Sequence, residues 1–129
     1  MDDNKPSPTA AELEILNILW EKEPLTVKDV HERLSLHKDI GYTTALKIMQ
    51  NMTSKGLLNR EPNGKNHLYY TSCKKEETRG TLLDRFLDSA FSGSSSSLVM
   101  QLLGNRKTNK SEIDEIKKII SQIENEQKP

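Results

Sequence analysis

The chain of 129 residues is poor in cysteine, aromatic residues and long hydrophobic runs. Its single cysteine, Cys73, excludes an internal disulfide framework. No apolar run approaches the roughly 20 residues that a membrane-spanning helix needs, and the first residues do not resemble a signal peptide. We therefore expect a cytoplasmic protein without direct membrane insertion.

The hydrophobic content is also low, at 33%, and the mean hydropathy is −0.72. A monomer of this length would bury only a modest apolar core. Burial of apolar surface against a partner would relieve that shortage. The composition is therefore typical of one ordinary domain, or of one small domain with an appended oligomerisation segment.

The residue patterns of common catalytic and metal sites are missing. The histidines His31, His37 and His67 form no H-E-x-x-H motif, and Cys73 has no C-x-x-C partner. The sequence has no Walker loop and no dinucleotide-binding glycine fingerprint. A metal site built from His31, His37 and Cys73 would have no characteristic ligand spacing. We expect no enzyme activity, no cofactor and no bound metal.

The segment from Gly41 to Gly56 predicts an amphipathic helix around which the rest of the chain is organised. Its apolar residues recur at i, i+3, i+4 and i+7: Ala45, Ile48, Met49 and Met52. The opposite face carries Thr43, Thr44, Lys47, Gln50, Asn51 and Ser54. This face has amides and a cation but no carboxylate, and such groups can read base edges or hold phosphates in a major groove. The alternative is an ordinary surface helix with a solvated polar face.

Residues 57–72, LLNREPNGKNHLYYTS, predict a β-hairpin around a Pro-Asn-Gly-Lys-Asn turn. We expect one set of side chains to cover the helices, namely Leu57, Leu58, Leu68 and Tyr70. The outward set is then Asn59, Arg60, Tyr69 and Thr71. The tip residues, Asn63, Gly64, Lys65, Asn66 and His67, could reach a phosphate or the minor groove. The alternative is a solvated turn, since turns favour Asn and Gly.

Two shorter helices are predicted before the central one. Thr9 and Glu12 have capping-box spacing and open a helix over about 10–22, which Pro24 ends. Thr26 starts a second helix over about 26–35, with Val27, Val30 and Leu34 facing inward. Residues 1–8 indicate a flexible arm. The order of elements over residues 9–73 is typical of a winged helix-turn-helix DNA-binding domain, mainly α with a small β-hairpin wing.

The charge distribution supports this interpretation although the net charge is zero. Residues 1–37 carry a net charge of −4 and residues 76–129 a net charge of −1. Residues 38–75 contain seven basic and two acidic residues, a net charge of +5. The positive charge thus falls on the proposed reading helix and hairpin, where release of counterions from DNA would use it.

Residues 74–129 predict a helical dimerisation domain. A helix over 76–91 is followed by the small-residue connector 92–97, a short apolar helix, and a final helix capped by Ser111 with Asp114. The connector is either flexible or a cap for the next helix. The residues assigned to the dimer contact are Leu83, Phe86, Leu87, Leu98, Leu102, Ile113, Ile116, Ile120 and Ile123. The alternative is a ligand pocket between the helices of 76–125.

Four segments in order carry a family resemblance: AELEILNILW (11–20), GYTTALKIMQNMTSKGLL (41–58), KNHLYYTS (65–72) and SLVMQLL (97–103). With them the chain resembles the BlaI/MecI/CopY family of bacterial repressors, the penicillinase-repressor type. The resemblance implies a homodimeric winged-helix repressor that binds double-stranded DNA at a palindromic operator. It also implies that the C-terminal helices form the dimer.

The resemblance and the helix pattern together give a set of candidate DNA contacts. They are Thr26, Tyr42, Thr43, Thr44, Lys47, Gln50, Asn51, Lys65 and Asn66. Family members paired with a membrane-bound sensor protease are induced by cleavage, and the matching bond here is Gln101–Leu102, inside a protease-sensitive segment near 92–103. Gln101 stands where the resistance repressors carry Asn, and Leu46 stands where they carry a basic residue.

Other functions stay open at this point. The copper-responsive branch of the family carries a C-terminal cysteine motif, and residues 104–129 contain no cysteine. One alternative is a winged-helix regulator controlled by a small ligand or a metal. Another is a winged helix that serves only protein interaction, which would show no salt-dependent affinity for DNA.

Overall fold

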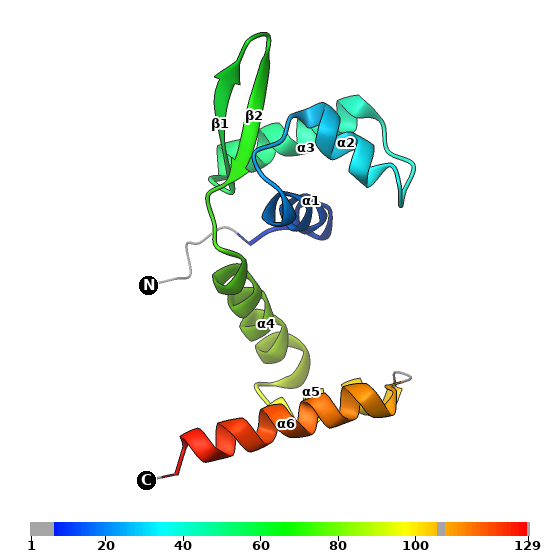
Figure 1. The fold of residues 1–129 in the computed structure, drawn as a ribbon, viewed down its shortest axis with the longest axis vertical. Coiled ribbons are helices and arrows are strands. Elements are labelled where there is room, and N and C mark those ends of the chain that lie inside the picture. Colours follow the sequence, from blue (N-terminus) through cyan, green and yellow to red (C-terminus); the bar gives the residue numbers. More distant parts are fainter. Residues whose placement is uncertain (1–6, 106–107, 129) are drawn as a thin grey trace. The chain divides into compact units, whose positions relative to one another are not determined.

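The computed structural model describes residues 7–105 and 108–128. Within these ranges the chain forms six helices and one two-stranded antiparallel hairpin (Figure 1). The elements are α1 (Ala10–Glu21), α2 (Val27–Leu34), α3 (Tyr42–Lys55), β1 (Leu58–Asn63), β2 (Asn66–Thr71), α4 (Lys75–Phe91), α5 (Ser95–Asn105) and α6 (Lys110–Glu126). The predicted fold class, mainly α with a small hairpin, is confirmed. None of the helices in the described ranges is long and apolar enough to cross a membrane.

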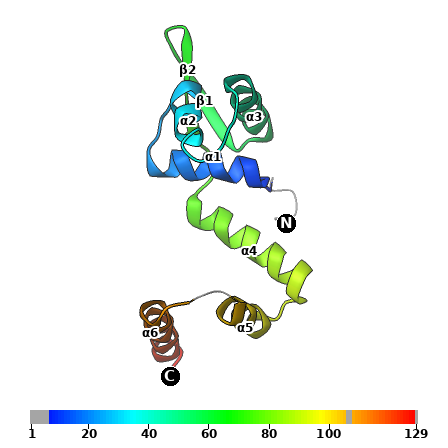
Figure 2. The ribbon, with the colours of Figure 1, turned by 90° about the vertical axis from the view of Figure 1, so that its right-hand side faces the viewer.

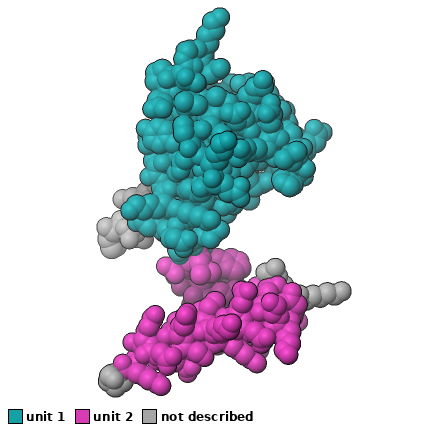
Figure 3. All heavy atoms as spheres, viewed as in Figure 1, with its two compact units in different colours: residues 1–82 teal, residues 83–129 magenta. Residues whose placement is uncertain are grey.

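The chain divides into two compact units, residues 1–82 and 83–129 (Figure 3). The boundary falls inside α4, so this helix contributes its first turns to one unit and the rest to the other. The assignment of DNA binding to residues 9–73 and of dimerisation to residues 74–129 remains a prediction. Most of the predicted arm, residues 1–6, lies outside the described residues.

Two capping boxes start α1 and α2. The hydroxyl oxygen of Thr9 accepts from the backbone N–H of Glu12, and the Glu12 carboxylate accepts from the N–H of Thr9. Thr26 and Asp29 make the same reciprocal pair at the start of α2. Each box satisfies two backbone donors that a helix start leaves without intrahelical partners. Both predicted helix starts are confirmed.

The first unit packs α1, α2 and α3 around one hydrophobic core that the hairpin completes. The three inward positions predicted for α2 are all buried, as are three of the four predicted for α3. Ile48, the fourth, is half-buried against the same core. The buried set is Ile15, Leu16, Leu19, Leu25, Val27, Val30, Leu34, Ala45, Met49, Met52, Leu57, Leu58 and Tyr69.

The hairpin faces the core with the opposite set of β2 side chains from the one expected. Tyr69 is buried and Tyr70 is exposed, so their predicted positions are wrong. Leu58 and Tyr69 share a face, because Leu58 pairs with Thr71 and strand side chains alternate. Leu57, which we placed with the strand, lies before β1 and does not follow its alternation. Backbone hydrogen bonds in both directions between Leu25 and Tyr69 also hold β2 against the α1–α2 connection.

In the second unit, small polar residues begin the helices. Ser94 caps α5 by accepting from the backbone N–H of Ser97, so the cap interpretation of the 92–97 connector is confirmed. Asn109 caps α6 by accepting from the N–H of Glu112, and the predicted cap at Ser111 is wrong. The predicted spacing, three residues from cap to carboxylate, occurs at both Asn109 and Ser111, and the first of the two starts the helix.

Candidate nucleic-acid interface

The reading helix α3 is fixed at its C-terminal end. Gly56 follows the helix with φ +86°, a left-handed conformation that side chains rarely adopt, and its N–H bonds back to the carbonyls of the last turn. The ammonium of Lys55 donates to both carboxylate oxygens of Glu12, at 2.9 Å each. The last turn of α3 is thereby tied to the first turn of α1.

Glu12 is the one charged residue that is buried among the described residues. Burial raises the pKa of its carboxyl group, but the hydrogen bond from the Thr9 backbone and the ammonium of Lys55 outweigh burial and hold the pKa below its ordinary value. The carboxylate therefore stays charged at neutral pH, and the link between α1 and α3 is an ion pair.

The outward face of α3 is exposed along its whole length. The assigned residues on it, Tyr42, Thr43, Thr44, Lys47, Gln50 and Asn51, are all exposed. The helix contains no aspartate or glutamate, so no carboxylate of α3 would repel a phosphate. The face therefore offers hydroxyl, amide and ammonium groups at positions that the core leaves free.

The ring of Tyr42 is oriented by a contact with His31. Its ring meets the ring of His31 edge-on, with 5.9 Å between ring centroids. His31 is itself fixed, because its Nε2 lies 2.7 Å from the carbonyl oxygen of Ile40 and donates to it. His31 thus has a structural role in placing the start of α3, although its sequence position suggested nothing specific.

The hairpin ends in a tight two-residue turn formed by Gly64 and Lys65 between the paired residues Asn63 and Asn66. Gly64 has φ +66° and Lys65 does not have a positive φ, as a type II′ hairpin turn requires. Lys65 and Asn66 are exposed. The turn therefore holds an ammonium and an amide at the tip of the wing.

Four of the nine assigned DNA contacts line one hollow of about 530 Å³, which we call the wing cradle. They are Thr26, Tyr42, Lys65 and Asn66, from the starts of α2 and α3 and from the wing. These three elements belong to the first unit (Figure 2). The other lining residues are Val27, Lys28, Leu46, His67 and Tyr69. Lys28 was missing from the assigned set. Its position two residues after the helix-capping Thr26 was the only signal for it.

Two of the three residues considered for a metal site, His31 and Cys73, make other contacts. The Cys73 thiol donates to the Leu57 carbonyl at 3.8 Å, and the Cys73 carbonyl accepts from the indole Nε1 of Trp20 at 3.1 Å. In the part of the chain that the structure describes, no three His, Cys, Asp or Glu residues are placed to hold a metal ion together.

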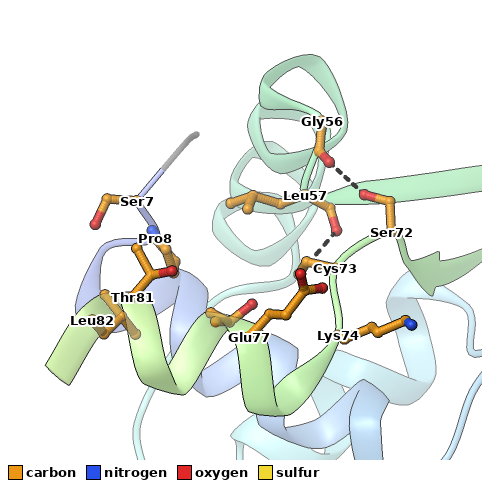
Figure 4. Close-up of a pocket in the computed structure, with 11 residues that line it drawn as sticks. Ser7, Pro8, Gly56, Leu57, Ser72, Cys73, Lys74, Glu77, Thr81 and Leu82 are labelled. Atoms are coloured by element: carbon orange, nitrogen blue, oxygen red, sulfur yellow. Dashed lines mark hydrogen bonds between the residues drawn. The ribbon is translucent and has the colours of Figure 1, made fainter. Parts of the chain in front are cut away.

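A second hollow, of about 210 Å³, lies at the start of α4 within the first unit. The backbone of Gly56 and Leu57 forms one wall, the Glu77 carboxylate points toward Cys73, and the Lys74 ammonium points away from the other lining residues (Figure 4). The ligand pocket considered above would lie between the helices of 76–125. In the described part of the second unit, an open apolar depression is lined by α5 residues alone.

The second unit leaves most of the assigned dimer residues in contact with solvent. Leu83, Phe86, Leu102, Ile113, Ile120 and Ile123 are between 36% and 52% exposed, and Leu87, Leu98 and Ile116 are half-buried. No residue of α4 or α6 is fully buried. The candidate cleavage bond, Gln101–Leu102, lies inside α5, and both of its residues are exposed.

Comparisons of the sequence with known proteins find similarity over most of the chain. A family model described as penicillinase repressor matches residues 8–122. The methicillin resistance regulatory protein MecI of Staphylococcus aureus is 23% identical over 121 residues, which are 94% of this chain and 98% of that protein. The transcriptional regulator BlaI of Mycobacterium tuberculosis is 26% identical over 112 residues, which are 85% and 80% of the two chains.

One solved structure supports the fold of the first unit. The solution structure of the DNA-binding domain of the repressor BlaI matches with a TM-score of 0.52 and 22% identity. The match covers 57% of this chain and 89% of that domain. The winged-helix fold predicted from the sequence is thereby confirmed.

Proposed function

Because the chain belongs to the penicillinase repressor family, we propose that it is a DNA-binding transcriptional repressor that acts as a homodimer on a palindromic operator. The observation that carries this proposal is the exposed, carboxylate-free face of α3 beside a wing with a basic tip. A protein-interaction helix would have no need to exclude acidic residues from this face. On a DNA-reading helix each carboxylate is repelled by nearby phosphates, so an acid-free face favours DNA binding.

The side chains of α3 divide the task of recognition. Gln50 and Asn51 present amides that can pair with adenine in two hydrogen bonds, and Lys47 can donate to guanine or to a phosphate. Thr43 and Thr44 lie in the first turn, where short hydroxyls approach the DNA closely. Residues of this kind specify bases, whereas Lys65 and Asn66 at the wing position the protein on the backbone.

The second unit supplies the partner contact in this proposal. Its exposed leucine, phenylalanine and isoleucine side chains would be buried against the same residues of a second copy, as a two-fold dimer requires. Two linked reading helices bind an operator of two half-sites far more tightly than one, because the second contact is intramolecular.

Relief of repression follows from the same arrangement. A membrane-bound sensor protease would cut Gln101–Leu102, separate α6 from the reading helix and weaken the dimer. Because the bond is inside a helix, the protease must first unwind α5 locally. A variant truncated after Gln101 should bind the operator as a monomer with reduced affinity. A truncated variant that stays dimeric with normal affinity would contradict this part of the proposal.

The experiment that tests the proposal is fluorescence-anisotropy binding to the DNA upstream of the protein's own gene, across a salt series and beside random DNA. The wild-type protein should bind the upstream DNA specifically and lose affinity steeply with salt. Lys47→Ala should weaken specific binding by about 1–3 kcal/mol. Lys118→Ala, which removes the same charge from an exposed position on α6, is the matched control and should change little.

Two results would count against the proposal. Equal, weak binding to both DNAs would indicate that this upstream DNA holds no operator, and selection of bound fragments from the whole genome would then decide whether one exists. Specific binding that is unchanged in Lys47→Ala would contradict the role of α3.

A further inference from the structure

The wing cradle has an apolar floor and a polar rim. The side chains of Val27 and Tyr69 are buried and that of Leu46 is half-buried, so they form the floor. The exposed lining residues, all polar or aromatic, are Lys28, Tyr42, Lys65, Asn66 and His67. The floor is fixed because it belongs to the same core that holds the three helices together.

The lysines that line the wing cradle have no acidic residue beside them in its lining. Lys28 approaches from the first turn of α2 and Lys65 from the wing, and no aspartate or glutamate lines the hollow. Two other hollows, one at the start of α4 and one between α1 and α2, are each lined by both a basic residue and a glutamate. Two ammonium groups without a carboxylate favour an anion, and the surrounding rim can add donors from Tyr42 and His67.

The shape of the cradle selects among anions. A free inorganic phosphate would leave the apolar floor uncovered, whereas the sugar of a nucleic acid backbone has an apolar face next to its phosphate. Tyr42 and Leu46 at the start of α3 line the cradle, so a DNA duplex read by that helix would pass its backbone close by. The donor set, the floor and the position all fit one sugar–phosphate unit of DNA.

We propose that the wing cradle seats one sugar–phosphate unit of the operator backbone, with Lys28 and Lys65 contacting its phosphate from opposite sides. This inference rests on the proposed function and extends it by naming Lys28 as a DNA contact. The cradle sets the register of α3 in the groove, because it joins the wing and the reading helix to the same phosphate.

The test combines protein variants with single neutral phosphates in the DNA. An operator duplex bound by the wild-type protein is made with one methylphosphonate at a time, which removes one backbone charge. One position in each half-site should lower the affinity of the wild-type protein by roughly 5- to 10-fold at about 0.1 M salt. Lys28→Ala removes one contact from each protomer of the dimer, so its affinity for unmodified DNA should fall by about the square of that factor and its salt slope by about two.

The decisive measurement combines the Lys28→Ala variant with the modified duplex. On a duplex neutralised at the cradle position of both half-sites, Lys28→Ala should bind as well as the wild-type protein does, because the charges that Lys28 contacts are already gone. Lys22→Ala, an exposed lysine in the same unit that does not line the cradle, is the matched control and should keep its full response to the methylphosphonate. Lys65→Ala should behave as Lys28→Ala does, at the same position.

The outcomes separate the two proposals. In the combined measurement, the affinity loss from Lys28→Ala could multiply with the loss from the methylphosphonate at every position. That result would overturn the proposed phosphate contact of the cradle and leave the repressor proposal intact. A wild-type protein with no specific DNA binding would overturn the repressor proposal first. Matching unfolding midpoints of the three variants and the wild-type protein, followed by Trp20 fluorescence, ensure that the comparison is made on folded protein.

Discussion

The ion pair between Glu12 and Lys55 permits a quantitative test of how α3 is held. The Nζ of Lys55 lies 2.9 Å from the Oε1 of Glu12. The side chain of Glu12 is 7% exposed and that of Lys55 is 41% exposed. Removing the ammonium with Lys55→Met keeps the aliphatic stem and leaves a buried carboxylate with its Thr9 contacts alone. Breaking a fully buried pair costs about 3–5 kcal/mol. Because water can reach the Lys55 side of this pair, we expect a loss of about 1–2 kcal/mol.

The matched control is the pair between Lys38 and Glu14, which has the same 2.9 Å separation. Its side chains are 39% and 45% exposed, and exposed pairs contribute about 0–1 kcal/mol. Lys38→Met should therefore cost clearly less than Lys55→Met. Urea unfolding followed by the fluorescence of Trp20, the only tryptophan in the sequence, reports on the unit that contains both pairs.

The pH dependence gives the same test a second readout. The pKa of Glu12 is lowered in the folded state, so its charged form stabilises the fold above the ordinary value of 4.5. This contribution is lost as the pH falls through the lowered folded pKa. The difference in stability between the wild-type protein and Lys55→Met should therefore be constant near neutral pH and narrow below pH 4.5. Equal losses in the two lysine variants, or a difference that does not vary with pH, would refute the reasoning.

Three further predictions concern the caps and the second unit. Gly56→Ala should lower stability by about 1 kcal/mol through backbone strain alone, because φ is +86° and the new Cβ meets no atom within 4 Å; an unchanged unfolding midpoint would contradict this. Thr26→Ala should cost about 1 kcal/mol in urea unfolding by removing the cap of α2, and Thr26→Ser should restore most of it. Ile116→Lys with Ile120→Lys should yield monomers in sedimentation velocity, whereas Ser121→Lys should not; dimers in the double variant would overturn the assigned contact.

The parts of the fold that the sequence predicted well are those decided within a few residues. The capping boxes at Thr9 and Thr26 bring donor and acceptor together three residues apart, and the inward stripes of α2 and α3 repeat over two or three turns. A local pattern of this kind leaves few alternatives. The helix starts and the core residues followed from it directly.

The wrong predictions concern positions where two nearby residues were equally suited to the same role. Tyr69 and Tyr70 are adjacent and both aromatic, so only the alternation set by Leu58 could decide which faces the core. Leu57 obscured that alternation, because it is apolar and buried but precedes the strand. At the last helix, Asn109 and Ser111 were both suitable caps. In each case the decision belongs to the folded surroundings of the residue.

The contacts that complete the candidate site were not visible in the sequence because they join distant segments. Glu12 and Lys55 are 43 residues apart, and Leu25 meets Tyr69 across the whole helix-turn-helix. The wing cradle likewise needs α2, α3 and the wing to be in place before Lys28 and Lys65 face one hollow. The exposed face of α3 could be predicted from its period alone. Its role as a base-reading surface stays a prediction.

The register of the hairpin has a consequence for the behaviour of the protein at high concentration. On one side β2 is bonded to Leu25, but in the described part of the chain β1 has no strand beyond it. An open strand edge can recruit a strand from another molecule and begin aggregation. Here the exposed edge carries Arg60 and Glu61, and Pro62 has no N–H to donate to an incoming strand. The wing can thus extend into solvent without becoming a template for sheet growth.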